Sequence, residues 1–275
     1  MSLYRFVYYQ LLKRHYFAIT GPNRVLPDFL IIGAKRCGTT SLFSHLPEHP
    51  SITKSHHDNM GFFNDNFHLG INWYRSFFPT KSLKKRIENK YEKCLSFDTT
   101  TTYMENKKTA ENVSAVKQNM KIIVMVRNPV DRAYSQYHRS IKDHAESRRF
   151  EDLVDEEIKK LDNEKEEIFQ IRRNESNYLK KGIYHNQLQP WFELFPRENI
   201  AIFSTEEFKL DSKKTYDDIF DFLNLPHFTI KNNTFMEKGN YLPMNKEIRG
   251  KLSDYYKDHN EKFFNLIGKK FEWND

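Results

Sequence analysis

The sequence predicts an α/β fold: a single domain with a central, mostly parallel sheet flanked by helices. Short apolar runs at residues 29–33, 94–98, 121–126 and 199–203 are typical of strands buried on both faces. Helical segments separate these runs, and this alternation indicates a parallel sheet with helices on both sides. A glycine-bounded loop directly follows the first run. Because such sheets bind ligands beyond the carboxyl ends of their strands, the residues after each strand are the candidates for a site.

The helical segments are bounded by residues that start or stop helices. Pro47 ends the segment that follows the glycine loop, and Pro196 ends an apolar-periodic segment from 184 to 195. A strongly charged helical region covers 145–167, and its charges are expected to face solvent. Asp211 opens a helix with core spacing through residue 223, and 244–273 is expected to form terminal helices.

Length and composition favour a single domain that binds an anionic ligand. The chain has 275 residues, and 44 Lys and Arg against 37 Asp and Glu give a net charge of +7. This balance suits an anionic ligand, but without a long basic run it does not indicate nucleic acid. Residues 1–27 are expected to form a lead-in and 28–275 the domain.

The cysteine count and the N-terminal segment bear on location. Two cysteines, Cys37 and Cys94, are too few for a disulfide framework, which fits a reducing compartment. Residues 3–19 mix apolar and basic side chains and lack the uninterrupted apolar run of a signal peptide or a membrane span. We therefore expect a cytoplasmic protein without stable membrane insertion.

The loop after the first strand is the clearest candidate site. Gly33 and Gly38 bracket four residues, and Thr39 then opens a helix. A strand, a glycine-bounded turn and a helix start place several backbone N–H groups around one point, which suits a phosphate or sulfate group. A nucleoside-triphosphate P-loop would require lysine directly after the second glycine. Here the cations lie inside the loop instead, at Lys35 and Arg36.

A second candidate anion site follows the strand at 121–126. Arg127 ends this strand, and Asn128 and Pro129 make a favourable helix start. Ser135 follows two turns into the helix. Arg127 and Ser135 can therefore hold a second phosphate through charge-assisted bonds.

Both stretches resemble sulfotransferases that use 3′-phosphoadenosine 5′-phosphosulfate (PAPS). The loop resembles that family's 5′-phosphosulfate loop, and the pattern R-x-P-x-x-R-x-x-S from Arg127 to Ser135 resembles its 3′-phosphate motif. The resemblance covers roughly residues 28–268 and implies a P-loop-like sulfotransferase fold, PAPS as co-substrate, PAP as product, and no metal. A later Lys-Gly pair resembles the family's nucleotide-closing loop. The resulting cofactor-binding candidates are Lys35, Arg36, Cys37, Gly38, Thr39, Thr40, Ser41, Arg127, Ser135, Lys238 and Gly239.

The sequence departs from the family at the two catalytic positions. Arg36 occupies the position of the family's catalytic lysine, and we expect it to stabilise the transferring group during in-line displacement. The glutamate that serves the family as general base has no counterpart between Lys54 and Phe63. Because histidine titrates nearest to neutral pH, His56 and His57 rank first as the base. Asp58 ranks next and Asp98 last.

The predicted activity is transfer of a sulfuryl group to a hydroxyl group, or as second choice an amine, of a small-molecule or sugar acceptor. The sequence does not identify the acceptor, since acceptor pockets are built from variable loops. Two alternatives stay open at this point: a P-loop kinase or NTPase, and a non-enzymatic nucleotide- or glycan-binding module. The absence of a lysine after Gly38 counts against the first.

Overall fold

A computed structural model describes residues 18–163, 171, 177–231, 236 and 241–273. Its centre is a five-stranded sheet in the order β2-β3-β1-β4-β5, in which every neighbouring pair is parallel. The strands are β1 (Phe29–Gly33), β2 (Ile52–Lys54), β3 (Leu95–Thr99), β4 (Lys121–Val126) and β5 (Ile200–Ser204). The predicted fold class is therefore confirmed.

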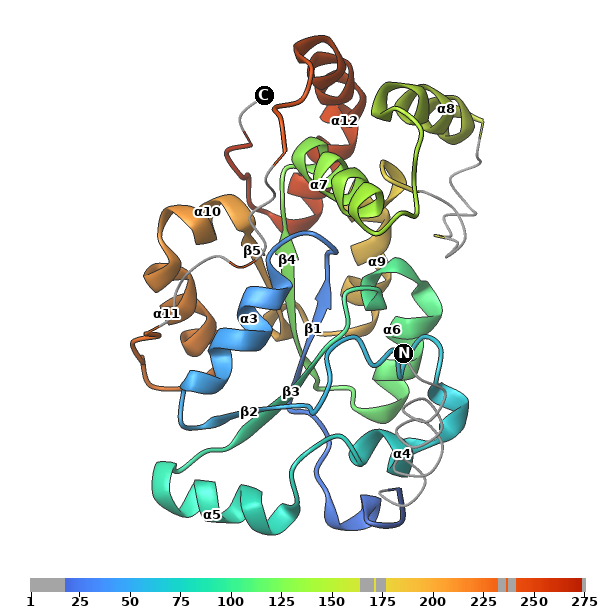
Figure 1. Cartoon of the computed structure of the whole chain (residues 1–275). Coiled ribbons are helices and arrows are strands. Elements are labelled where there is room, and N and C mark those ends of the chain that lie inside the picture. Colours follow the sequence, from blue (N-terminus) through green and yellow to red (C-terminus); the bar gives the residue numbers. More distant parts are fainter. Residues whose placement is uncertain (1–17, 164–170, 172–176, 232–235, 237–240, 274–275) are drawn as a thin grey trace.

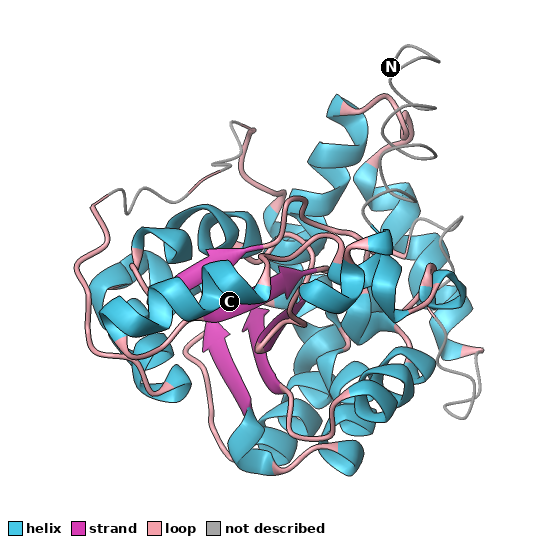
Figure 2. Ribbon diagram, turned by 90° about the horizontal axis from the view of Figure 1, so that it is seen from below, coloured by secondary structure: helices cyan, strands magenta, loops and turns pink. Residues whose placement is uncertain are grey.

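Helices cover both faces of the sheet, as Figures 1 and 2 show. In Figure 1, α3, α10 and α11 lie to one side of the strands, and α6 lies to the other, where it contacts α9. The helices are α3 (Thr39–His45), α4 (Ile71–Arg75), α5 (Lys81–Tyr91), α6 (Lys107–Val116), α7 (Pro129–Lys142), α8 (Phe150–Asp162), α9 (Tyr184–Leu194), α10 (Thr205–Leu210), α11 (Ser212–Leu223) and α12 (Lys246–Ile267). Short 3₁₀ turns are η2 (Gly21–Asn23), η3 (Leu46–Glu48), η4 (Phe67–Leu69), η5 (Tyr103–Glu105), η7 (Lys180–Gly182) and η8 (Arg197–Asn199).

The core explains why the central strands are apolar throughout. All five residues of β1 are buried, and β1 lies between β3 and β4 with Ile31 level with Thr99 and Ile123. A strand covered on both faces needs an unbroken apolar run, as 29–32 and 122–126 provide. A second apolar cluster joins α7, α8, α12 and the residues on either side of η7, around Val130, Leu153, Leu179, Leu252 and Tyr256. This second cluster fixes α7 where it begins, next to the carboxyl end of β4.

The start of α7 agrees with the prediction from sequence. The Asn128 side chain caps the helix by accepting a hydrogen bond from Val130 N, and Pro129 is the first helical residue. Arg132, one turn further, is fully buried; its guanidinium donates to Gln136 Oε1 at 2.7 Å and to the Tyr178 carbonyl. Arg132 is therefore a structural arginine that ties α7 to the segment before η7.

The structure corrects the strand assignments at three places. Two predicted strands lie one residue further along, at Leu95–Thr99 and Ile200–Ser204. The three-residue edge strand β2 was missed, since three residues are too few to show a pattern. Because all five strands are parallel, the segments after Gly33, Lys54, Thr99 and Val126 emerge at one edge of the sheet.

Candidate functional site

The loop between β1 and α3 bends sharply at two residues. Arg36 has a φ of 73° and Gly38 a φ of 87°, both in the left-handed region. This conformation is easy for glycine and costs free energy for arginine. Gly38 is the N-cap of α3, and among the described residues no side chain caps that helix start. The first turn of α3 therefore points uncapped N–H groups toward the space in front of the loop.

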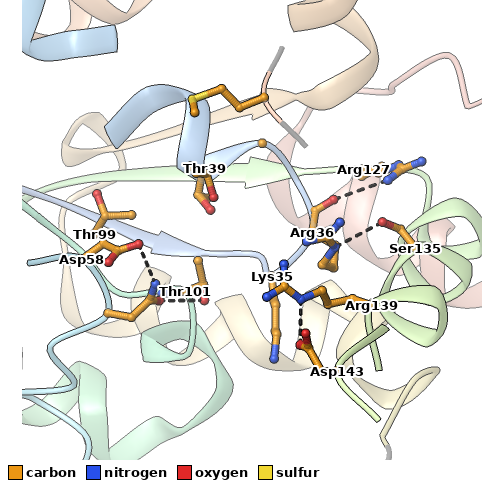
Figure 3. A pocket seen from close by; sticks show the side chains of 14 residues that line it. Lys35, Arg36, Thr39, Asp58, Thr99, Thr101, Arg127, Ser135, Arg139 and Asp143 are labelled. Atoms are coloured by element: carbon orange, nitrogen blue, oxygen red, sulfur yellow. Dashed lines mark hydrogen bonds and ion pairs between the residues drawn. The ribbon is translucent and has the colours of Figure 1, made fainter. Parts of the chain in front are cut away.

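A polar pocket of about 300 Å³ opens in front of this loop (Figure 3). Its walls come from the segments that follow β1, β2, β3 and β4, as expected for ligand sites of parallel sheets. The residues that line it are Lys35, Arg36, Gly38, Thr39, Thr40, Asp58, Asn59, Thr99, Thr101, Arg127, Ser135, Arg139, Asp143 and Met236.

The basic wall unites the two predicted anion sites. Arg36 Nε donates a hydrogen bond to Ser135 Oγ at 3.2 Å, so the loop and α7 meet there. Arg127 Nη1 lies 3.5 Å from the Arg36 carbonyl oxygen. Arg127 Nε is buried and has no hydrogen-bond partner within the part of the chain that the structure describes. A buried N–H group of this kind costs free energy unless an acceptor, such as an anion, takes a hydrogen bond from it.

Lys35 lies on the same wall, and its surroundings make its charge less stable. Desolvation of the ammonium group lowers the pKa of Lys35, and the positive charge of Lys181 lowers it further. Glu105, which pairs with Lys181 at 3.2 Å, acts in the opposite direction. An anion in the pocket would relieve this unfavourable concentration of positive charge.

Asp58 lies on the other side of the pocket from Arg127 and Ser135 (Figure 3). Its Oδ2 accepts a hydrogen bond from Asn59 Nδ2 at 3.2 Å. Asn59 Oδ1 in turn accepts bonds from the backbone N and the hydroxyl of Thr101, each at 3.1 Å. Asn59 has a φ of 50°, in the left-handed region, and residues 56–58 form a bend directly before it. These contacts hold the carboxylate at the pocket.

The two histidines ranked first as the base do not line this pocket. His56 N donates to the Phe77 carbonyl at 3.0 Å, and the His57 ring lies edge-on to Phe77 with centroids 6.2 Å apart. Both residues are exposed. Of the three candidates at 56–58, the geometry favours Asp58, which reverses the order expected from sequence.

Asp98 lies in the core and not in the pocket. It is fully buried; its Oδ2 accepts bonds from Tyr103 Oη at 2.7 Å and Tyr74 Oη at 2.9 Å, and its Oδ1 accepts one from Thr100 Oγ1 at 3.1 Å. Burial raises the pKa of Asp98 to about 6, although these hydrogen bonds act in the opposite direction. A carboxyl group enclosed by two tyrosines cannot reach an acceptor in the pocket, so the geometry assigns Asp98 a structural role.

The remaining cofactor candidates divide into three groups. Lys35, Arg36, Gly38, Thr39, Thr40, Arg127 and Ser135 line the pocket together. Cys37 and Ser41 do not: the Cys37 side chain is fully buried, and Ser41 Oγ accepts a hydrogen bond from Met236 N at 3.0 Å. Lys238 and Gly239 lie outside the described residues.

Sequence reasoning did not select six residues of the lining: Asn59, Thr99, Thr101, Arg139, Asp143 and Met236. Helical spacing could have found two of them. Arg139 lies four residues after Ser135 on α7, and Asp143 follows after four more, so the three share one face. Arg139 Nε donates to Asp143 Oδ2 at 2.7 Å.

Comparison with known proteins identifies the family. The model of the sulfotransferase domain matches residues 26–275. The chain belongs to the sulfotransferase family. This confirms the predicted family and the predicted sulfotransferase activity, and it removes the kinase and the non-enzymatic alternatives. The domain boundary at residue 28 stays a prediction.

Several curated sulfotransferases are similar to most of this chain. The membrane-associated sulfotransferase kil1 of Dictyostelium discoideum is 26% identical, over 93% of this chain and 68% of that protein. The human bifunctional heparan sulfate N-deacetylase/N-sulfotransferase 3 is 28% identical, over 89% of this chain but 30% of that protein. The mouse heparan sulfate glucosamine 3-O-sulfotransferase 3B1 is 25% identical, over 91% of this chain and 66% of that protein. The chain thus spans about two thirds of two of these sulfotransferases and less than a third of the bifunctional one.

A solved structure supports the sulfotransferase fold. The sulfotransferase from Alicyclobacillus acidocaldarius superimposes with a TM-score of 0.70 at 22% identity, covering 90% of this chain and 98% of that one. Within the described residues, no group of three or more His, Cys, Asp and Glu side chains is arranged to hold a metal ion. In the same residues, every helix is too short or too polar to cross a membrane.

Proposed function

We propose that this sulfotransferase moves a sulfuryl group from PAPS to a hydroxyl group of a sugar or another small polar acceptor. The observation that carries the proposal is the composition of one pocket: Arg36, Arg127 and Ser135 form its basic side, and Asp58 lies across from them. The basic side suits a sulfuryl donor with two anionic groups. Asp58 suits an acceptor hydroxyl that must lose a proton.

PAPS fits as the donor because two separate anion sites line the same pocket. The loop from Lys35 to Thr40 suits the 5′-phosphosulfate, since a helix start and two cations surround one point. Arg127 and Ser135 suit the 3′-phosphate, which adenosine 5′-phosphosulfate lacks. The buried Arg127 Nε, which has no hydrogen-bond partner among the described residues, supports this assignment.

The transfer step is an in-line displacement at sulfur. The acceptor oxygen forms a bond to sulfur while the bond between sulfur and the bridging phosphate oxygen breaks, and PAP leaves with that electron pair. Negative charge grows on the bridging oxygen, so a fixed cation in the loop stabilises the transition state more than the ground state. Arg36 supplies this charge without losing its own proton, and Lys35 lies beside it.

Asp58 accepts the proton of the acceptor hydroxyl. A hydroxyl group has a high pKa, and a base within hydrogen-bond reach contributes typically 10²–10⁴ in rate. Among the candidates at 56–58, the pocket contains the Asp58 carboxylate and neither histidine.

The acceptor side of the pocket suits a polyhydroxy compound. Asn59, Thr99 and Thr101 bring an amide and hydroxyl groups to the wall that holds Asp58. Such groups give and accept hydrogen bonds in the way that sugar hydroxyls require. Two of the related enzymes are named for heparan sulfate, one as an N-sulfotransferase, and this supports a sugar and keeps an amine as second choice.

The test is transfer of label from radiolabelled PAPS to panels of sugars, amino sugars and small alcohols, with the base examined by substitution. We predict that Asp58→Asn lowers kcat by about 10²–10⁴ while PAP binding is retained, because the proton then has no acceptor. His56→Ala and His57→Ala are the matched controls and should keep most of the activity. A histidine variant that abolishes turnover, with Asp58→Asn still active, would move the base to that histidine.

A further inference from the structure

Two buried hydroxyl groups connect the two anion sites from inside the protein. Tyr184, the first residue of α9, is 1% exposed, and its Oη donates a hydrogen bond to the Arg127 carbonyl at 2.9 Å. The same oxygen lies 3.4 Å from Arg127 N and 3.8 Å from Cys37 Sγ. One phenol therefore contacts both the end of β4 and the loop that carries Arg36.

Thr205 makes a parallel connection from α10. It is fully buried, and its Oγ1 lies 2.9 Å from the Cys37 carbonyl oxygen and 2.8 Å from the Val126 carbonyl oxygen. Cys37 belongs to the loop, and Val126 is the last residue of β4. Thr205 thus bridges the same two segments as Tyr184, through backbone atoms on both sides.

These connections begin where the ladder between β1 and β4 ends. The register of the two strands is irregular between Ile31 and Gly33, and Ala34 N makes a last backbone bond to the Met125 carbonyl at 2.6 Å. Beyond that point, Tyr184, Thr205 and a long 3.5 Å contact from Arg127 Nη1 to the Arg36 carbonyl oxygen join the loop to the end of β4. The spacing between the loop and Arg127 therefore depends on these side chains.

We infer that Tyr184 and Thr205 are positioning residues that set the distance between the 5′ and the 3′ anion sites. The inference rests on the proposed function. Neither residue lines the pocket, so both act through other residues. Tyr184 acts through the Cys37 side chain and the Arg127 backbone, and Thr205 acts through the carbonyl groups of Cys37 and Val126. When this distance is fixed, a nucleotide that carries both anionic groups contacts both sites at once. The free energy of binding then includes no cost for ordering the two sites relative to each other.

The chemistry of Tyr184 and Cys37 suits a fixed, uncharged connection. Burial and the proximity of Cys37 raise the pKa of Tyr184 well above its ordinary value, so it stays a phenol that can donate. Burial raises the pKa of Cys37 to about 11, so its thiol stays neutral and does not disturb the anion sites.

Calorimetric titration of Tyr184→Phe, Thr205→Val and Thr205→Ser with three ligands tests the inference. The ligands are PAP, AMP and 3′-AMP, which present both anions, the 5′ anion alone and the 3′ anion alone. Tyr184→Phe and Thr205→Val should each weaken PAP about tenfold, as expected for one buried hydrogen bond. AMP and 3′-AMP should change by less than about threefold, because a single anion needs no fixed spacing. Thr205→Ser keeps the hydroxyl and should bind PAP like the wild type.

The control is Tyr216→Phe, which removes another buried tyrosine hydroxyl, the one 2.6 Å from His45 Nδ1, and should leave all three affinities unchanged. If Tyr184→Phe and Thr205→Val weaken the binding of PAP and of the two monophosphates equally, the substitutions disturb each anion site itself and not the distance between the sites. That result would overturn the inference. Unchanged PAP binding in either variant would overturn it as well. If the wild type binds PAP no more tightly than AMP, the proposed donor itself fails.

Discussion

Arg36 is the residue on which the proposed chemistry depends most. It stands where the family has a catalytic lysine, it adopts a left-handed φ of 73°, and its Nε donates to Ser135. The bond to Ser135 holds the guanidinium beside both anion sites. A positive charge held in this way needs no reorganisation when charge develops on the leaving oxygen.

We predict that Arg36→Ala lowers kcat by about 10²–10³ with little change in PAP affinity, because the charge acts mainly in the transition state. Steady-state kinetics together with PAP calorimetry measure the two effects separately. Arg36→Lys is the matched control and should recover part of the rate, since it restores a cation at the position of the family's lysine. Unchanged turnover in Arg36→Ala would transfer the role to Lys35.

The residues on the basic side of the pocket could be predicted from the sequence, but which of residues 56–58 lines the pocket could not, and the reason is local geometry. Glycine spacing and a helix start are properties of neighbouring residues, so Gly33, Gly38, Arg127 and Ser135 are recognisable in the sequence. His56, His57 and Asp58 are adjacent, and which of them faces the pocket depends on the backbone conformation at the bend and at Asn59. Asn59 is held by bonds from Thr101, more than forty positions away in the chain.

At the scale of elements, the central strands β1 and β4 could be predicted from the sequence, but the edge strand β2 could not. β1 and β4 are continuous apolar runs because helices cover both of their faces, and their bounds agree with the predictions. β2 has three residues with a mixed burial pattern, so its place in the sheet is decided by pairing with β3. The surroundings of Asp98 could not be predicted for a related reason: its position at a strand end indicated the pocket, but its side chain points to Tyr74 and Tyr103.

Asp98 gives a pH prediction for these elements. Its pKa of about 6 lies above the ordinary value of 3.8, so the folded protein binds this proton more tightly than the unfolded chain does. The stability contributed by that proton is complete below about pH 4 and is lost as the pH rises through about 6. This contribution to the free energy of unfolding amounts to about 3 kcal/mol at most.

Asp98→Asn, which stays neutral at every pH, should therefore gain stability relative to the wild type between about pH 4 and pH 7. Urea denaturation at several pH values measures the free energy of unfolding of both proteins. Asp254→Asn, at an exposed position on α12, is the control and should follow the wild type. Parallel curves for Asp98→Asn and the wild type would contradict a raised pKa, and loss of all transfer activity in a folded Asp98→Asn would return Asp98 to the candidates for the base.

At the scale of the whole molecule, one sheet edge brings distant segments into one site. The lining residues run from Lys35 to Met236, and none of the segments that carry them forms the pocket alone. The family match over residues 26–275 and the superposition on a bacterial sulfotransferase agree with this architecture. The acceptor depends on loops rather than on the sheet, so its class stays a proposal, and the cytoplasmic location expected from sequence stays a prediction.

The central claim is that one pocket binds a nucleotide by two anionic groups, and calorimetry with PAP and AMP tests it most directly. The wild type should bind PAP roughly tenfold to a hundredfold more tightly than AMP, since charge-assisted bonds to a 3′-phosphate contribute about 1.5–3 kcal/mol each. Arg127→Ala should lose this preference while AMP binding hardly changes, and Arg86→Ala, on the exposed surface of α5, should keep it. Equal affinities of the wild type for PAP and AMP, or equal losses of both ligands in Arg127→Ala, would contradict the account.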